Sequence, residues 1–125
     1  MTEDEKKRLA LDPDGLQTYE YIANNIGTSG LEIDWLADNM IRVDTNGQFT
    51  GSAARYLHAI NHEQFRPQIS ALIAATIDKD REHRYLPALL QGIYGEDCEE
   101  RAAELSACDD NFRRIYKRLH PTSIL

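Results

Sequence analysis

The chain has 125 residues, which is the length of one ordinary domain. Apolar residues make up 42% and charged residues 28% of it, which is close to the globular average, so the composition calls for neither a fibrous nor a disordered chain. The formal net charge of -7 argues against a surface that binds nucleic acid or anionic lipid over its whole area. No apolar run approaches the roughly 20 residues that span a bilayer, and no signal peptide is visible, so we expect a cytoplasmic protein outside the membrane.

The first helices are predicted from the spacing of apolar residues. Residues 1–11 form a charged segment that is expected to be frayed or partly helical. Asp12-Pro13 is typical of a helix start, because proline fits the first helical position. Apolar residues then recur at spacings of three and four until Gly27, which is expected to end this helix.

The segment that follows changes character. Ser29 and Glu32 have the spacing of a capping box, which predicts a second helix that reaches Met40. Residues 41–50 place apolar or β-branched residues on both sides of Asn46-Gly47, the strongest short sequence signal of a hairpin. We therefore expect a short β-hairpin near residues 41–50, the alternative being a plain loop before the next helix.

Helices are predicted again from residue 52 onwards. The longest is expected from about residue 67 to residue 84, and a short apolar one over 88–94 is expected to end at Gly95. The last two are expected over 96–107 and over 109–120. No internal repeat and no linker is evident. The sequence predicts a mainly α fold, a single compact domain over residues 1–125 with about six helices and the one hairpin.

The two cysteines, Cys98 and Cys108, are too few for a disulfide scaffold. Ten residues along one helix span about 15 Å, which is beyond disulfide reach. We expect both thiols to be reduced, as is usual in the cytoplasm.

The charge is unevenly distributed near the C-terminus. Residues 96–110 are strongly acidic, whereas the last helix has a basic face made of Arg113, Arg114, Lys117 and Arg118. These four side chains are candidates for contact with a partner or with nucleic acid phosphates. The alternatives are a solvated helix with Asp109 as its cap, and charge pairing within the chain or across a symmetric homodimer.

One segment resembles the helix-turn-helix corner of DNA-binding proteins. The positions that carry the resemblance, within residues 19–36, are Ile22, Ala23, Ile26, Gly27, Ile33 and Leu36. The resemblance implies a recognition helix that begins near Ser29, and the expected hairpin at 41–50 would then be the wing of a winged helix. Ordinary helix packing explains the same residues.

The would-be recognition helix departs from that pattern in its charge. It presents Glu32, Asp34 and Asp38, although DNA-reading helices present basic or amide side chains to bases and phosphates. The nearest bases are Arg42 and Arg55. The acidic face therefore weakens the DNA-binding interpretation.

A pair of histidines is the candidate metal site. His58 and His62 are four residues apart in a predicted helix, so both rings lie on one face and could bind a metal such as zinc. Glu63 follows directly and is the third candidate ligand, with His83, Glu82 or a cysteine as other sources. The alternative is a pair of surface histidines.

Three functions from different classes follow. The leading one is a non-catalytic interaction or regulatory module that binds protein, either another copy of itself or a different partner, and needs no cofactor. The second is a DNA-associated regulator that uses residues 19–36 or the basic C-terminal helix. The third is a metal-dependent enzyme built on His58, His62 and Glu63.

Overall fold

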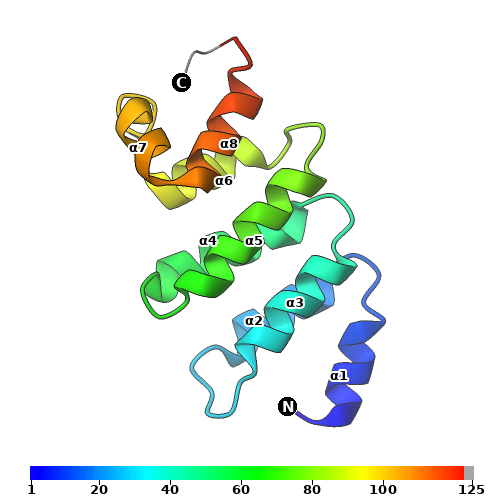
Figure 1. Ribbon diagram of the computed structural model, residues 1–125. Helices are drawn as coiled ribbons and strands as arrows, with labels where there is room; N and C mark the ends of the chain where they lie inside the picture. Colours follow the sequence, from blue (N-terminus) through cyan, green and yellow to red (C-terminus); the bar gives the residue numbers. More distant parts are fainter. Residues whose placement is uncertain (123–125) are drawn as a thin grey trace.

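The computed structural model describes residues 1–122 and folds them into eight α-helices (Figure 1). The helices are α1 (Glu3–Ala10), α2 (Leu16–Asn25), α3 (Ile33–Val43), α4 (Gln48–Asn61), α5 (Arg66–Lys79), α6 (Leu86–Tyr94), α7 (Ala102–Cys108) and α8 (Asp110–Leu119). The prediction of a mainly α fold is confirmed. Residues 1–122 contain no β-strand, so the expected hairpin is wrong, as is the number of six helices. None of the helices in this part of the chain is long and apolar enough to cross a bilayer.

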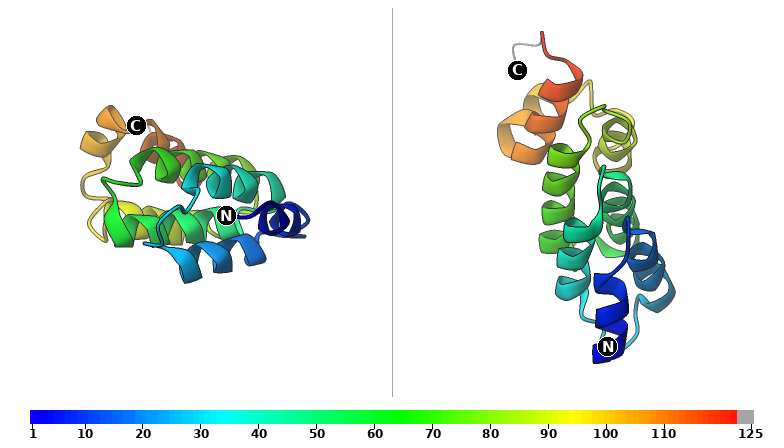
Figure 2. Two further views of the ribbon diagram at one scale, coloured as in Figure 1. Left: turned by 90° about the horizontal axis from the view of Figure 1, so that it is seen from below. Right: turned by 90° about the vertical axis from the view of Figure 1, so that its right-hand side faces the viewer.

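The helices form two layers that are stacked along one axis. Figure 2 shows α1, α3 and α5 side by side in one layer and α2, α4 and α6 in the other, with α7 and α8 at the C-terminal end. Helices in contact within a layer include α3 with α5 and α2 with α4, and α4 packs against α5 between the layers.

The loops that join the pairs α1–α2 and α3–α4 have the same hydrogen-bond pattern. In the first, one carboxylate oxygen of Asp12 accepts the backbone N–H of Gly15, and the other accepts the backbone N–H of Thr18. In the second, Asp44 makes the same bonds to Gly47 and Thr50. The chain thus repeats an Asp-x-Asx-Gly-x-x-Thr motif in successive helix pairs, although no repeat was expected.

This loop explains why residues 41–50 are not a hairpin. α3 continues to the buried Val43, and α4 begins at Gln48. Between them Gly47 has a φ of 90°, which an L side chain rarely adopts, while Asp44 accepts the backbone N–H groups at the start of α4. The Asn-Gly pair therefore makes a turn between two helices. The buried carboxylate of Asp44 accepts the backbone N–H groups that would pair with a second strand in a hairpin.

A third carboxylate ends α5 early. Asp80 is buried and accepts the backbone N–H groups of Arg84, Tyr85 and Leu86. The chain therefore turns at Asp80, and the helix expected to reach residue 84 stops at Lys79. The three loops that contain these carboxylates lie along one edge of the stack (right-hand side of Figure 1).

Two further helix starts differ from the expectation. Ser29 does not cap a helix, because α3 begins only at Ile33 and Glu32 instead lies 2.9 Å from the ammonium group of Lys6. The acidic stretch 96–101 forms turns, and α7 begins at Ala102. By contrast, the segment at 1–11 is well capped, since Thr2 and Glu5 form the capping box of α1.

Candidate functional site

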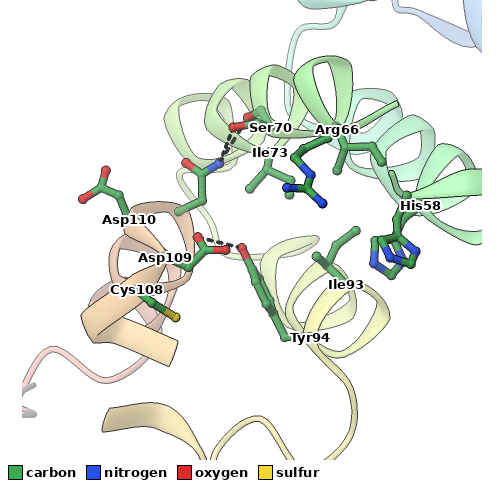
Figure 3. Close-up of a pocket in the computed structure, with 12 residues that line it drawn as sticks. His58, Arg66, Ser70, Ile73, Ile93, Tyr94, Cys108, Asp109 and Asp110 are labelled. Atoms are coloured by element: carbon green, nitrogen blue, oxygen red, sulfur yellow. Dashed lines mark hydrogen bonds between the residues drawn. The ribbon is translucent and has the colours of Figure 1, made fainter. Parts of the chain in front are cut away.

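A groove with a volume of about 680 Å³ lies where α4 and α5 meet α6 and α8 (Figure 3). This volume lies within the range of about 300–1,000 Å³ that is typical of pockets for small ligands. The side chains that line it are His58, His62, Arg66, Ile69, Ser70, Ile73, Ile93, Tyr94, Cys108, Asp109, Asp110 and Asn111. The groove thus collects residues from four helices and from the junction of α7 with α8.

One end of the groove is basic. The imidazole rings of His58 and His62 stack with their centroids 5.2 Å apart at the C-terminal end of α4. Arg66, the first residue of α5, extends its guanidinium group into the groove (Figure 3). Burial of the His58 ring, together with the nearby His62, lowers the pKa of His58 below its usual value. The imidazole is therefore neutral near pH 7 while the guanidinium is charged.

The opposite wall is acidic and is held in place by hydrogen bonds. Asp109 caps α8 by accepting the backbone N–H of Phe112, and the same oxygen accepts the hydroxyl of Tyr94 at 3.1 Å. Burial of the phenol, with the Asp109 carboxylate beside it, raises the pKa of Tyr94. Tyr94 thus stays a hydrogen-bond donor at any physiological pH and links α6 to the start of α8.

Apolar side chains connect the two ends. Ile69 and Ile73, on successive turns of α5, are buried side chains that contribute to the groove. Ile93 on α6 is half-buried and lies across from Ile73 (Figure 3). Asn111 donates to the backbone carbonyl of Ser70 and so ties the start of α8 to α5. These bonds preform the groove, which reduces the entropy that a ligand has to offset on binding.

The histidine pair lacks a third metal ligand in the described structure. His58 and His62 do share one face, as their spacing predicts, and both line the groove. Glu63 is exposed and is not among the lining residues. Within residues 1–122, no three His, Cys, Asp or Glu side chains converge in a way that could hold a metal ion. The two cysteines are free thiols, Cys98 buried and Cys108 exposed beside the groove.

Three of the four bases on α8 have partners within the chain. Arg113 bonds to Asp110, Arg114 lies 2.9 Å from the carboxylate of Asp78, and Arg118 donates to the backbone carbonyl of Ile77. Lys117 is exposed and has no ion pair within residues 1–122. Arg114 and Arg118 therefore attach α8 to α5, while Arg113 pairs within α8 itself.

The segment 19–36 forms two packed helices with a long connector. α2 ends at Asn25 and α3 begins at Ile33, whereas a helix-turn-helix joins its helices by a turn of about three or four residues. α3 lies between α1 and α5 in one layer: Trp35 packs under the ammonium group of Lys6, and Asp34 accepts a hydrogen bond from Gln68. The basic Arg42 is also engaged, with Asn39 and the carbonyl of Ala10.

Sequence reasoning found the histidine pair but missed Arg66, Ile93 and the role of Asp109 in the groove. Their only sequence signals are local: Arg66 precedes a helix-starting proline, and Asp109 was recognised as a cap. Comparisons of the chain with protein-family models, with curated proteins and with solved structures found no match in any of the three.

Proposed function

We propose that this chain is a non-catalytic binding module that holds a short segment of a partner protein in the groove between α4–α5 and α6–α8. The observation that carries the proposal is the groove itself, about 680 Å³ in volume, with isoleucines between a basic and an acidic end. Apolar surface with a few well-placed polar groups is the usual composition of a recognition site.

The stacked architecture supports the same function. Helix-pair stacks expose extended surfaces along their length, and these surfaces are what such proteins use for binding. Here the groove is lined by residues of α4 and α5 and of the C-terminal helices, so its walls come from units that are distant in sequence. The hydrogen bonds of Tyr94 with Asp109 and of Asn111 with Ser70 hold these walls together without a ligand.

Selection of peptides on the folded protein tests the proposal. A displayed library of random peptides is enriched on the immobilised chain, and the binding site of each selected peptide is mapped from shifts of backbone amide NMR signals. We expect the shifted signals to cluster on residues that line the groove, with Ile69, Ile73 and Ile93 among them.

A pair of matched variants controls this experiment. Ile93→Asp places a charge on the half-buried wall of the groove, whereas Ile60→Asp makes the same change at a 49% exposed position of α4 that does not line it. Ile93→Asp should abolish binding of the selected peptides, and Ile60→Asp should leave it unchanged. Equal binding by both variants, each verified as folded by circular dichroism, would show that the groove is not the recognition site.

A further inference from the structure

The basic end of the groove offers charge without a partner in the described structure. No carboxylate of residues 1–122 lies within ion-pair distance of the Arg66 guanidinium, and its N–H groups make no hydrogen bond there. Arg66 also begins α5, where the helix dipole adds partial positive charge. A planar guanidinium with free donors is suited to bind a carboxylate through two parallel hydrogen bonds.

The acidic wall offers an acceptor. One oxygen of Asp109 takes both the Tyr94 hydroxyl and the Phe112 N–H, and the second oxygen accepts no hydrogen bond from residues 1–122. Asp109 is half-buried and points into the groove in Figure 3, while Asp110 points away from it and bonds to Arg113. A ligand that crosses the groove therefore meets donors at one end and an acceptor at the other.

We propose that the groove recognises an acidic side chain flanked by aliphatic residues in the partner segment. The carboxylate binds Arg66, the neighbouring aliphatic side chain packs on Ile73 and Ile93, and a backbone N–H of the segment donates to the free oxygen of Asp109. This assignment rests on the proposed function, and it adds the chemical class of the ligand.

A singly charged carboxylate fits the groove better than a phosphate does. At neutral pH Arg66 supplies a full positive charge at the basic end, whereas His58 is neutral because its pKa is lowered. A phosphoryl group carries a charge of about -1.5 to -2 and would be repelled by the carboxylate of Asp109 at the other wall. The formal net charge of -7 on the whole chain acts in the same direction.

His58 makes this recognition dependent on pH. A carboxylate bound at Arg66 favours the protonated imidazole of His58, whose pKa is lowered below 6.5 by burial and by the charge of His62, so the affinity for an acidic segment rises as the pH falls through this range. The ionisable groups that line the groove with His58 are His62 at the end of α4, Arg66 on α5, Tyr94 on α6, and Cys108, Asp109 and Asp110 where α7 meets α8.

Two defined peptides test the inference. Acetyl-Leu-Glu-Leu-amide and acetyl-Leu-Gln-Leu-amide are titrated into the labelled protein up to about 10 mM, which reveals millimolar affinity. We expect the Glu peptide to bind the groove with an affinity at least about tenfold higher than that of the Gln peptide, as a charge-assisted bidentate contact implies. Its affinity should increase further at pH 6, whereas that of the Gln peptide should not.

Variants of Arg66 distinguish its contact with the carboxylate from a general effect of positive charge on the protein. Arg66→Gln should remove the preference for Glu, and Arg66→Lys should retain only part of it, because lysine cannot form the two parallel bonds. Arg81→Gln makes the same charge change at an exposed arginine outside the groove and should leave the preference intact. Arg66 is itself exposed, so a thermal melt of Arg66→Gln should match that of the wild type.

The outcomes distinguish this inference from the proposed function. If both peptides bind the groove equally, or if Arg66→Gln keeps the preference, recognition of a carboxylate is wrong while the groove remains a binding site. If neither peptide shifts the groove signals, the inference is wrong, and the selection with Ile93→Asp decides the proposed function separately. If a peptide with phosphoserine in place of Glu binds more tightly than the Glu peptide, the carboxylate assignment is wrong and the ligand group is a phosphoryl group.

Discussion

The carboxylate of Asp12 accepts both the backbone N–H and the side-chain hydroxyl of Thr18, at 2.8 Å and 2.7 Å. Both residues are almost completely buried, so these bonds replace water that the carboxylate loses on folding. Asp44 and Thr50 repeat the backbone bond at 2.9 Å in the next helix pair. A buried carboxylate that caps the following helix is thus a recurrent element of this chain.

Replacing this carboxylate should destabilise the protein. Asp12→Asn presents an amide group to the N–H and hydroxyl donors of Thr18, so at least one charge-assisted bond is lost. We expect the free energy of unfolding at pH 7 to fall by about 1.5 to 3 kcal/mol, measured by urea denaturation. Asp38→Asn, at an exposed position of α3, is the control and should change it by less than about 0.5 kcal/mol. Equal effects would contradict the role of Asp12.

The same carboxylate should contribute to acid unfolding. Burial opposes ionisation of Asp12, but the hydrogen bonds from Thr18, Gly15 and Asp14 outweigh it and lower the pKa of this carboxyl group. A lowered pKa in the folded state means that Asp12 stabilises the protein above the unfolded value of about 4 and ceases to do so as the pH falls through the folded value. The difference in stability between wild type and Asp12→Asn should therefore shrink below about pH 4, as measured by urea denaturation at each pH.

Substitutions at two glycines should distinguish the cost of backbone strain from the cost of steric crowding. Gly47 and Gly30 both have positive φ, 90° and 81°, but a Cβ atom at Gly47 would lie 3.2 Å from the Cβ of Asp80, whereas none is near Gly30. Gly30→Ala should cost about 1 kcal/mol of unfolding free energy through strain alone. Gly47→Ala should cost at least about 1 kcal/mol more, because the loop must move away from Asp80. Equal costs in thermal or urea unfolding would show that crowding there is absent.

The hydroxyl of Tyr94 should be the last phenol to ionise. Burial and the adjacent Asp109 raise its pKa, so alkaline titration by ultraviolet absorbance should show a tyrosine that ionises only when the protein unfolds. Tyr94→Phe should remove that phase and lower the unfolding free energy by about 1 kcal/mol. Tyr85→Phe is the control, because its hydroxyl makes no hydrogen bond within residues 1–122. A late phase that persists in Tyr94→Phe would contradict the assignment.

The charge of His62 should affect the pKa of His58. Burial and the charge of His62 lower the pKa of His58, so His62→Gln should raise it towards the usual value in an NMR titration. His83→Gln, on the α5–α6 loop, should leave the pKa of His58 unchanged. Because the folded-state pKa is lowered, His58 reduces stability as the pH falls through about 6.5, and His58→Gln should weaken that dependence. An unchanged His58 titration in His62→Gln would contradict the coupling.

Helical periodicity was sufficient to predict the fold class. The apolar stripes of the long helices are buried as expected, for example Leu72 and Ile77 on α5 and Phe112 and Ile115 on α8. Asp109 caps the start of α8 and Gly95 ends α6, as predicted. The errors occur at loops. A turn residue pair such as Asn46-Gly47 serves a hairpin and a helix connection equally well, and only the buried Asp44 distinguishes them.

The candidate site was predictable only in part. The spacing of His58 and His62 places both on one helix face, which is a local property of α4. Their proximity to Arg66, Ile93 and Asp109 depends on how α4, α5, α6 and α8 pack, and no local pattern contains that information. The repeated Asp-x-Asx-Gly-x-x-Thr motif was a signal of stacked pairs that a comparison of the loops at Asp12 and Asp44 would have revealed.

The linear stacking of the helix pairs has a consequence for how the molecule opens. α1 contacts α3 but lies far from α6 and α8, so its unfolding need not disturb the groove. Amide hydrogen exchange should therefore proceed in steps along the stack, with α1 exchanging through local opening while α4 and α5, which share the largest contact, exchange last. A truncation that removes α1 would then lower the overall stability and yet leave a molecule with its groove intact.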